Sequence, residues 1–288
     1  MIIDGKKFAQ ELRNEIKKEI ESIKKTSNTT PGLTVVLVGN HTPSEIYVRN
    51  KELSAKEVGI TSEVIRFESS ITEEKLIEVI HGLNKDKKVH GILVQLPLPP
   101  HINGSKIIEE IDPKKDVDGF HPVNVGNLSS GKDSLVPCTP LGSYLLIKNV
   151  QKNLTGLEAL IIGRSNLNGK PMAQLLLKED CTVTIGHSKT KNLKELCQKA
   201  DIVVAAVGRA NLVKGDWVKE GAIVIDVGIN REEDKTEKKG YKIVGDVEFD
   251  SVVKKARAIT PVPGGVGPMT IACLLNNTLK AFKNINYL

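Results

Sequence analysis

Apolar and polar residues alternate between helical and strand periods from one end of the chain to the other. Residues 4–25 repeat an apolar side chain every three or four positions within a charged segment, which predicts a long amphipathic helix. Apolar and β-branched runs then predict strands at 33–39, 60–67 and 91–97, with helices between them at 43–58 and 72–84. Strands that are apolar throughout are typical of a parallel sheet with helices on both faces.

A second alternating block follows the P-C-T-P sequence at 137–140. It is expected to open with a helix at 141–149, and four short apolar runs then predict strands at 157–163, 181–186, 201–208 and 222–228. The charged segment 231–240 is interpreted as a solvated loop.

The two blocks predict an α/β fold of two domains with a cleft between them. The first domain is expected to comprise residues 1–138 together with 270–288, because the last helix, 269–281, is expected to pack back on the first block. The second domain, residues 139–269, is expected to be Rossmann-like with a mostly parallel sheet.

Composition removes several classes of protein. The chain has 288 residues, 41 of them basic and 35 acidic, for a net charge of +6. Its five Phe, four Tyr and one Trp are too few for the stacking surfaces of a single-strand nucleic-acid binder. No apolar run approaches the roughly 18 to 20 residues of a membrane span, and the first residues lack an apolar signal core, so a cytoplasmic location is expected. Four separated cysteines and six dispersed histidines predict no metal site.

The strand 157–163 runs into the turn G-R-S-N-L-N-G-K-P at 163–171. A strand, a glycine turn and a helix present free backbone N–H groups and the positive end of the helix to a phosphate. The candidate phosphate-binding residues are therefore Gly163, Arg164, Ser165 and Gly169. The glycine spacing is not G-x-G-x-x-G, so an ordinary tight turn remains the alternative on this segment alone.

The next predicted strand ends in G-H-S-K-T at 186–190. NAD-binding domains usually carry a carboxylate here for the ribose hydroxyls. The residues in that place are His187, Ser188, Lys189 and Thr190. Their hydroxyl and ammonium groups, with the Arg164 guanidinium, suit an additional phosphate. The sequence therefore predicts NADP in preference to NAD.

One lysine in the first block, Lys51, is predicted to lie on a partly apolar helix face. Ser44, Tyr47 and Lys51 share one face of the predicted helix, which would place Lys51 among partly apolar neighbours. A surface lysine with a buried stem is the alternative. Gln95, in a buried-looking strand, and Asp118, in an acidic turn, are expected to meet Lys51, and partial burial would lower the pKa of the lysine toward neutrality.

A late segment, T-P-V-P-G-G-V-G-P-M-T at 260–270, combines three glycines with three prolines. Such a loop is rigid and poor in bulky side chains, so its backbone can approach a flat ligand closely.

Ordered motifs along nearly the whole chain carry a family resemblance. The chain resembles the bacterial bifunctional methylenetetrahydrofolate dehydrogenase/methenyltetrahydrofolate cyclohydrolase family. The matching segments are S-E-I-Y-V-R-N-K (44–51), G-I-L-V-Q-L-P-L-P (91–99), K-D-V-D-G-F (115–120), P-C-T-P (137–140), G-R-S (163–165), G-K-P (169–171), H-S-K-T (187–190), D-V-G-I-N (226–230), G-D-V (245–247) and P-V-P-G-G-V-G-P-M-T (261–270).

The resemblance implies two consecutive reactions of one-carbon folate metabolism. A hydride passes from 5,10-methylenetetrahydrofolate to NADP, and water then opens the methenyl cation to 10-formyltetrahydrofolate, a step that needs no metal. It further implies the interconversion of tetrahydrofolates for purine biosynthesis, a polyglutamylated folate as a possible substrate, and a homodimer.

The resemblance also implies roles for individual residues. Lys51 would transfer the proton and Gln95 would tune it. Tyr47 would stack on the folate, Asp118 would hold the pterin side, and Ser44 would support the same helix face. The remaining assignments are the folate pocket for Pro263 and Gly264, the cofactor phosphates for Arg164, Ser165 and Ser188, and the nicotinamide for Ile229.

The chain departs from the family at Asn168, where an aliphatic residue is usual before the glycine of the turn, a change that bears on cofactor affinity. Two other functions remain as alternatives: a dehydrogenase without cyclohydrolase activity, and a non-catalytic NADP-binding sensor.

Overall fold

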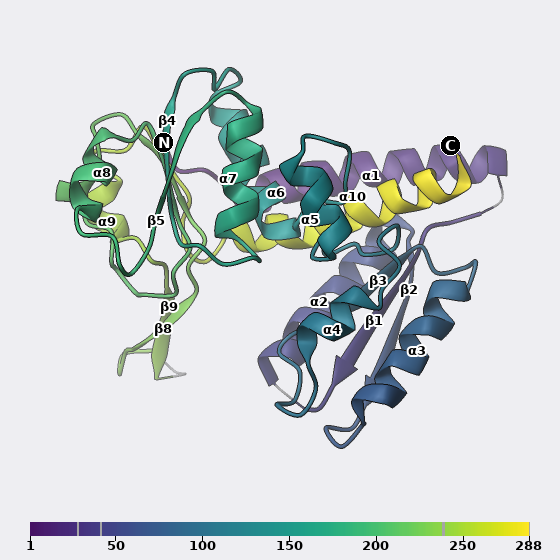
Figure 1. Cartoon of the computed structure of the whole chain (residues 1–288). Coiled ribbons are helices and arrows are strands. Elements are labelled where there is room, and N and C mark those ends of the chain that lie inside the picture. The colour runs from purple at the N-terminus through teal and green to yellow at the C-terminus, as the bar shows by residue number, and fades with distance from the viewer. Residues whose placement is uncertain (28, 41, 238–239, 288) are drawn as a thin grey trace. The chain divides into compact units, whose positions relative to one another are not determined.

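A computed structural model describes residues 1–27, 29–40, 42–237 and 240–287 and divides the chain into two compact units (Figure 1). The three-stranded unit comprises Gln10–Cys138 and Ile271–Leu288, and the five-stranded unit comprises Met1–Ala9 and Thr139–Thr270. Both contain a parallel sheet with connecting helices, which confirms the predicted α/β class.

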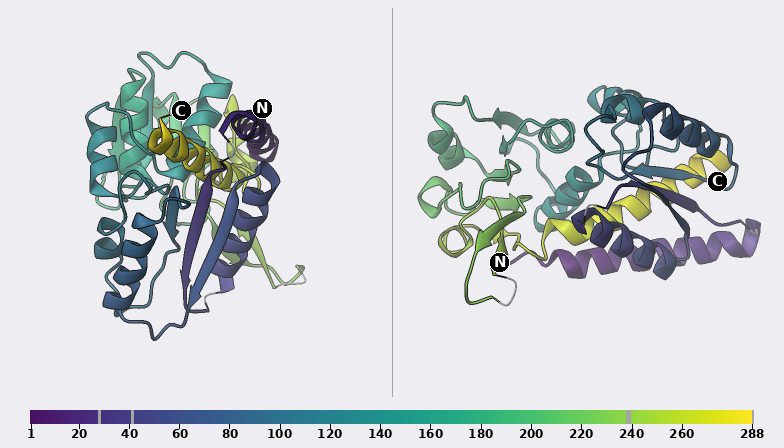
Figure 2. Two further views of the ribbon diagram at one scale, coloured as in Figure 1. Left: turned by 90° about the vertical axis from the view of Figure 1, so that its right-hand side faces the viewer. Right: turned by 90° about the horizontal axis from the view of Figure 1, so that it is seen from below.

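The three-stranded unit has the strand order β2-β1-β3, with all pairs parallel. Its strands are β1 (Gly32–Val38), β2 (Thr61–Phe67) and β3 (Gly91–Val94), and helices α2 (Thr42–Val58) and α3 (Glu73–Lys85) lie along the sheet (Figures 1 and 2). Every residue of β1 is buried, as its continuous apolar run predicts. β3 ends at Val94, short of the predicted 97, and the Gln95 N–H makes one more hydrogen bond, to the Val36 carbonyl.

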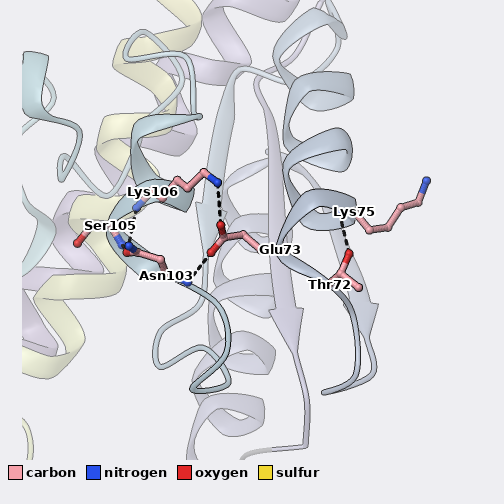
Figure 3. Close-up of polar contacts among 6 residues, drawn as sticks. All are labelled: Thr72, Glu73, Lys75, Asn103, Ser105 and Lys106. Carbon is pink, nitrogen blue, oxygen red and sulfur yellow. Dashed lines mark hydrogen bonds and ion pairs between the residues drawn. The ribbon is translucent and has the colours of Figure 1, made fainter.

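Two short helices in this unit were not predicted: α4 (Gly104–Glu109) and α5 (Pro122–Ser129). Side-chain caps define where helices begin (Figure 3). The side chain of Asn103 accepts hydrogen bonds from the N–H groups of Ser105 and Lys106, and the Glu73 carboxylate accepts from the Asn103 N–H at 2.7 Å and from Lys106 Nζ at 2.8 Å. The start of α4 is thus joined to the start of α3.

The five-stranded unit has the parallel strand order β10-β7-β6-β4-β5. Its strands are β4 (Glu158–Ile162), β5 (Thr182–Gly186), β6 (Ile202–Ala205), β7 (Ile223–Asp226) and β10 (Ala258–Ile259). The helices are α7 (Gly169–Lys178), α8 (Leu193–Lys199) and α9 (Phe249–Val252), with a 3₁₀ turn at Gly215–Trp217. α6 (Cys138–Val150) opens the block. The four predicted strands and the parallel Rossmann-like sheet are confirmed, while β10 was not predicted.

The interpretation of 231–240 as a loop was wrong at its start, where residues 231–233 belong to a strand, and a second strand begins directly after its end. β8 (Asn230–Glu233) and β9 (Tyr241–Val244) form an antiparallel hairpin. Glu232 lies opposite Lys242 and pairs with it at 3.0 Å, and the Arg231 guanidinium lies 4.8 Å from the Tyr241 ring centre. Cross-strand charge pairs stabilise this hairpin although it has almost no apolar pattern, and such pairs cannot be seen in a charged run before the register is known.

The two ends of the chain belong to different units. The N–H of Ile3 donates to the Ile259 carbonyl at 2.8 Å, so residues 1–9 group with the five-stranded unit, whereas the predicted boundary placed them in the other domain. The long helices are α1 (Gly5–Ser27) and α10 (Val266–Asn286), and residues from 271 onward group with the three-stranded unit, as expected for the last helix. Within the described ranges, no helix combines the length and the apolar character that a bilayer crossing requires.

Candidate active site and cofactor-binding turn

Lys51 is a buried lysine that points to a polar partner. It lies on α2 with only 8% of its surface exposed, and its Nζ donates to Gln95 Oε1 at 2.9 Å. Gln95 follows β3; its N–H donates to the Val36 carbonyl and its Nε2 to the Leu96 carbonyl at 2.8 Å. The amide oxygen of Gln95 is therefore held toward the lysine, as expected for two polar groups in apolar surroundings.

Asp118 is electrostatically coupled to the same lysine. Burial raises the pKa of Asp118 to about 6; the Lys51 charge opposes this rise, and the neighbouring Asp116 carboxylate adds to it. The Cys138 thiol lies 3.9 Å from Asp118 Oδ1. An amine, an amide and a carboxylate therefore lie near one another, as predicted for Lys51, Gln95 and Asp118. This combination suits proton transfer and the binding of a nitrogen-rich ring.

The structure distinguishes the two aspartates of the turn 115–120. Asp116 is buried, and its carboxylate accepts hydrogen bonds from the Gly119 N–H at 3.1 Å, from the His121 N–H at 2.8 Å and from Asn124 Nδ2 at 2.9 Å. Because its carboxylate is occupied by these donors, Asp116 stabilises the turn, and the Asp118 carboxylate is the one available to bind a ligand.

Tyr47 and Ser44 lie on α2 ahead of the lysine. Tyr47 is 41% exposed, so a flat ligand can reach its ring one turn before Lys51. Ser44 is buried, which fits support of the helix face more closely than direct contact with a ligand.

Two residues of this site were missed from the sequence. Asn277, in α10, donates through Nδ2 to the carbonyls of Val117 at 2.9 Å and Val136 at 2.8 Å. The Cys138 thiol donates to the same Val117 carbonyl at 3.3 Å. Together they hold the segments on either side of Asp118. An amide in the otherwise apolar run A-C-L-L-N-N-T-L was the available signal.

The turn at 163–171 follows β4 and is called the phosphate turn below, after its predicted role. It requires its two glycines. Gly163 has φ +132°, and a Cβ there would lie 2.4 Å from the Ala206 carbonyl oxygen. A Cβ on Gly169 would lie 2.1 Å from the Gly163 carbonyl oxygen. The turn therefore closes tightly on the start of α7, which suits a backbone cradle for a phosphate.

The polar residues of the turn face outward. Arg164 and Ser165 are exposed, and Ser165 Oγ accepts from the Asn168 N–H at 3.1 Å. Asn168 immediately precedes α7, and its side chain makes no capping hydrogen bond. The hydrogen bond of this unusual residue to Ser165 thus comes from its backbone N–H.

The end of β5 forms a compact turn without a carboxylate. The His187 N–H donates to Thr190 Oγ1 at 2.9 Å, and His187 Nδ1 accepts from the Lys189 N–H at 3.2 Å. Ser188 is exposed beside them. The Gly163 N–H donates to the Gly186 carbonyl at 2.9 Å, so this turn adjoins the phosphate turn.

Ile229, Pro263 and Gly264 lie in loops of the five-stranded unit. Ile229 is 55% exposed and directly precedes β8. Pro263 is exposed, and Gly264 has φ +105°, a left-handed conformation that favours glycine. Among the described residues, no group of three or more His, Cys, Asp or Glu side chains is arranged to hold a metal ion.

Comparison with known proteins agrees with this geometry. The family model "Tetrahydrofolate dehydrogenase/cyclohydrolase, catalytic domain" matches residues 3–118, and the corresponding "NAD(P)-binding domain" model matches residues 137–286. The "Bifunctional protein FolD" of Pelagibacter ubique is 62% identical over 283 residues, 98% of each chain.

Solved structures resemble the whole chain. The bifunctional FolD enzyme of Campylobacter jejuni has a TM-score of 0.94 at 48% identity, covering 99% of both chains. The FolD of Trypanosoma brucei, solved with NADP cofactor and inhibitor, has a TM-score of 0.94 at 38% identity, covering 100% of this chain and 99% of its own. The resemblance carried by the motifs is confirmed: the chain belongs to the tetrahydrofolate dehydrogenase/cyclohydrolase family.

Proposed function

We propose that the protein is a bifunctional folate enzyme with two activities. The dehydrogenase removes a hydride from the methylene carbon of 5,10-methylenetetrahydrofolate and gives the methenyl cation. The cyclohydrolase adds water to that cation, releases one proton and opens the ring to 10-formyltetrahydrofolate. The observation that carries this proposal is the joining of the Lys51 amine to Gln95 beside Asp118, within a family whose curated members are named bifunctional.

In this proposal Lys51 moves the proton of the attacking water. The Gln95 amide oxygen keeps the amine directed into the site by their 2.9 Å hydrogen bond. Asp118 accepts hydrogen bonds from the amino group and ring nitrogens of the pterin, and Tyr47 stacks on the ring. Pro263 and Gly264 line the folate pocket, and Ser44 supports the helix.

NADP is the proposed cofactor and, when bound, accepts the hydride. The cradle formed by Gly163 and Gly169 fits a dinucleotide phosphate, because a side chain at either position would strike the backbone. Arg164, Ser165 and Ser188 are exposed and suit its phosphates, His187 shapes the adjoining turn, and Ile229 borders the nicotinamide.

Arg164→Ala is expected to raise the Kd for NADP at least about tenfold and leave the Kd for NAD nearly unchanged, because one charge-assisted contact is lost. Equal affinity of the parent protein for both cofactors would contradict the NADP assignment.

Lys51→Met tests the proton-transfer role. Hydrolysis of the methenyl compound is expected to fall by about 10²- to 10⁴-fold, the usual contribution of a general acid or base. Lys56→Met is the matched control, because Lys56 is on the same helix, exposed and paired with Glu52. Near-normal hydrolysis by Lys51→Met would contradict the role and favour a sensor. A parent protein that oxidises the methylene compound without accelerating methenyl hydrolysis would be a monofunctional dehydrogenase.

We further propose a cytoplasmic homodimer that accepts polyglutamylated folates. The net charge of +6 suits anionic ligands with glutamate tails. Sedimentation of the purified protein tests the dimer, and KM values for folates with increasing tail length test the preference.

A further inference from the structure

Two motifs of the chain, D-V-G-I-N at 226–230 and G-D-V at 245–247, lie at the two ends of the β8–β9 hairpin. Each contributes a buried aspartate, Asp226 and Asp246, and the proposed reaction uses neither. We refer to these two residues as the aspartate pair.

Asp226 joins the end of β7 to the return strand of the hairpin. Its Oδ1 accepts from the N–H groups of Gly228 at 3.0 Å and Asp246 at 2.9 Å, and its Oδ2 accepts from the Val247 N–H at 2.9 Å. The Asp226 N–H donates to Thr260 Oγ1 at 2.8 Å, at the start of the 260–270 loop. Burial raises the pKa of Asp226 to about 7, and these backbone donors oppose the rise.

Asp246 holds the loop that follows the neighbouring strand, β6. Its Oδ2 accepts from the N–H groups of Val207 at 2.6 Å and Gly208 at 3.0 Å. Its Oδ1 accepts from the Arg209 N–H at 2.8 Å and from Asn230 Nδ2 at 2.9 Å. One fully buried side chain therefore fixes three consecutive backbone groups after β6 and one side chain after β7.

The glycines of both motifs make room for these carboxylates. A Cβ on Gly245 would lie 1.7 Å from Asp226 Oδ2, and a Cβ on Gly228 would lie 2.3 Å from Asp246 Oδ1. The glycine of each motif therefore makes room for the carboxylate of the other motif. This reciprocity indicates that the two motifs form one structural unit.

The aspartate pair lies where an open α/β sheet binds a dinucleotide. From β4 the chain goes to β5 on one side and to β6 on the other, so the order β7-β6-β4-β5 reverses direction between β4 and β6. Ligands bind at the carboxyl ends of strands at such a point. The phosphate turn and the β5 end form the adenosine side, and the loops after β6 and β7 form the opposite side.

We infer that Asp226 and Asp246 are positioning residues for the nicotinamide half of the dinucleotide site. By fixing residues 207–209, Gly228 and Asn230 they hold the backbone around Ile229. This inference rests on the proposed function, and it assigns neither residue a contact with the cofactor.

Asp246→Asn is the direct test. The amide replaces one oxygen with an NH₂ group, which then faces backbone N–H donors instead of accepting from them. The KM for NADP is expected to rise at least about tenfold, since charge-assisted hydrogen bonds are lost. Inhibition by 2′,5′-ADP, which carries only the adenosine half, is expected to stay within about twofold. Hydrolysis of the methenyl compound without cofactor is expected to persist, because Lys51, Gln95 and Asp118 belong to the three-stranded unit.

Asp201→Asn is the matched control. Asp201 belongs to the same unit and accepts from the Glu158 N–H at 3.0 Å, but it lies just before β6, at the amino ends of the strands. It is expected to leave the KM for NADP unchanged. If Asp246→Asn does not fold, Asn230→Ala removes a single donor to Asp246, and a smaller rise of the same kind is expected.

Three results would overturn the inference: an unchanged KM for NADP in the folded variants, equal weakening of 2′,5′-ADP and NADP, or loss of methenyl hydrolysis in step with dehydrogenation. Failure of the proposed function is distinguishable, since the parent protein itself would then lack the two activities.

Discussion

Replacing Asn277 by Ala tests how the last helix holds the Asp118 segment. Asn277 is 1% exposed, and its Nδ2 donates to the carbonyls of Val117 and Val136 at 2.9 and 2.8 Å. Val117 immediately precedes Asp118, and Val136 lies two residues before Cys138. Alanine deletes both N–H donors: the part-buried Val136 carbonyl loses this partner, and the Val117 carbonyl keeps only the Cys138 thiol, a weak donor.

The expected cost follows from those two acceptors. The unpaired Val136 carbonyl costs about 1–3 kcal/mol, and the Val117 carbonyl, which keeps the thiol, loses a hydrogen bond worth about 0.5–1.5 kcal/mol, so the two together cost about 1.5–4.5 kcal/mol. The higher helix propensity of Ala returns roughly 0.6 kcal/mol. The free energy of unfolding is therefore expected to fall by about 1–4 kcal/mol. With a urea m-value near 3 kcal/mol/M, the unfolding midpoint drops by about 0.3–1.3 M.

Asn276→Ala is the control, because the preceding residue has the same helix propensity and is only partly buried. Urea unfolding of both variants, followed by circular dichroism, measures the difference, and the KM for folate is expected to rise only in Asn277→Ala. Equal midpoints for the two variants would refute the reasoning, since the two hydrogen bonds would then contribute nothing measurable.

Two further predictions concern pH and the phosphate turn. Because burial raises the pKa of Asp118 to about 6, the carboxylate is lost as pH falls through 6, and folate affinity is expected to fall with it. The effect on folding has the opposite sign. The pKa of Asp118 is about 6 in the folded protein and about 3.9 in the unfolded chain, so between these pH values the folded state binds more protons. The contribution of Asp118 to the free energy of unfolding therefore declines as pH rises through that interval. Folate KM measured from pH 5 to 8 should show this step, and Asp118→Asn should abolish it; a step that survives the substitution belongs to another group. Gly169→Ala is expected to raise the KM for NADP at least about tenfold while methenyl hydrolysis persists, because its Cβ would lie 2.1 Å from a backbone oxygen that must move. Gly82→Ala, which meets no atom within 4 Å, is the control, and an equal effect of both substitutions would count against a specific role of the turn.

The sequence determined most of the regular structure and the type of chemistry. Apolar runs such as 33–39 and 157–163 become buried parallel strands, because only a doubly covered sheet satisfies apolar side chains on both faces. Local motifs also indicated Lys51, Gln95 and Asp118, because an amine or an amide in apolar surroundings needs a partner. The hairpin at 230–244 could not be predicted in the same way, because its stability depends on pairs such as Glu232 with Lys242 that exist only in one register.

Only the tertiary structure decided which polar residues support the site. Asp116 and Asp118 are indistinguishable in the turn D-V-D-G, and backbone donors commit the first to shape while the second remains available. Asn277 reaches Val117 across 160 positions of sequence, and Asp246 reaches Val207 across 39. Sequence periodicity records which face of an element is buried, but a hydrogen bond between distant segments depends on where the folded backbone places its N–H and C=O groups. For that reason the aspartate pair and the Asn277 bridge were visible only in the folded chain.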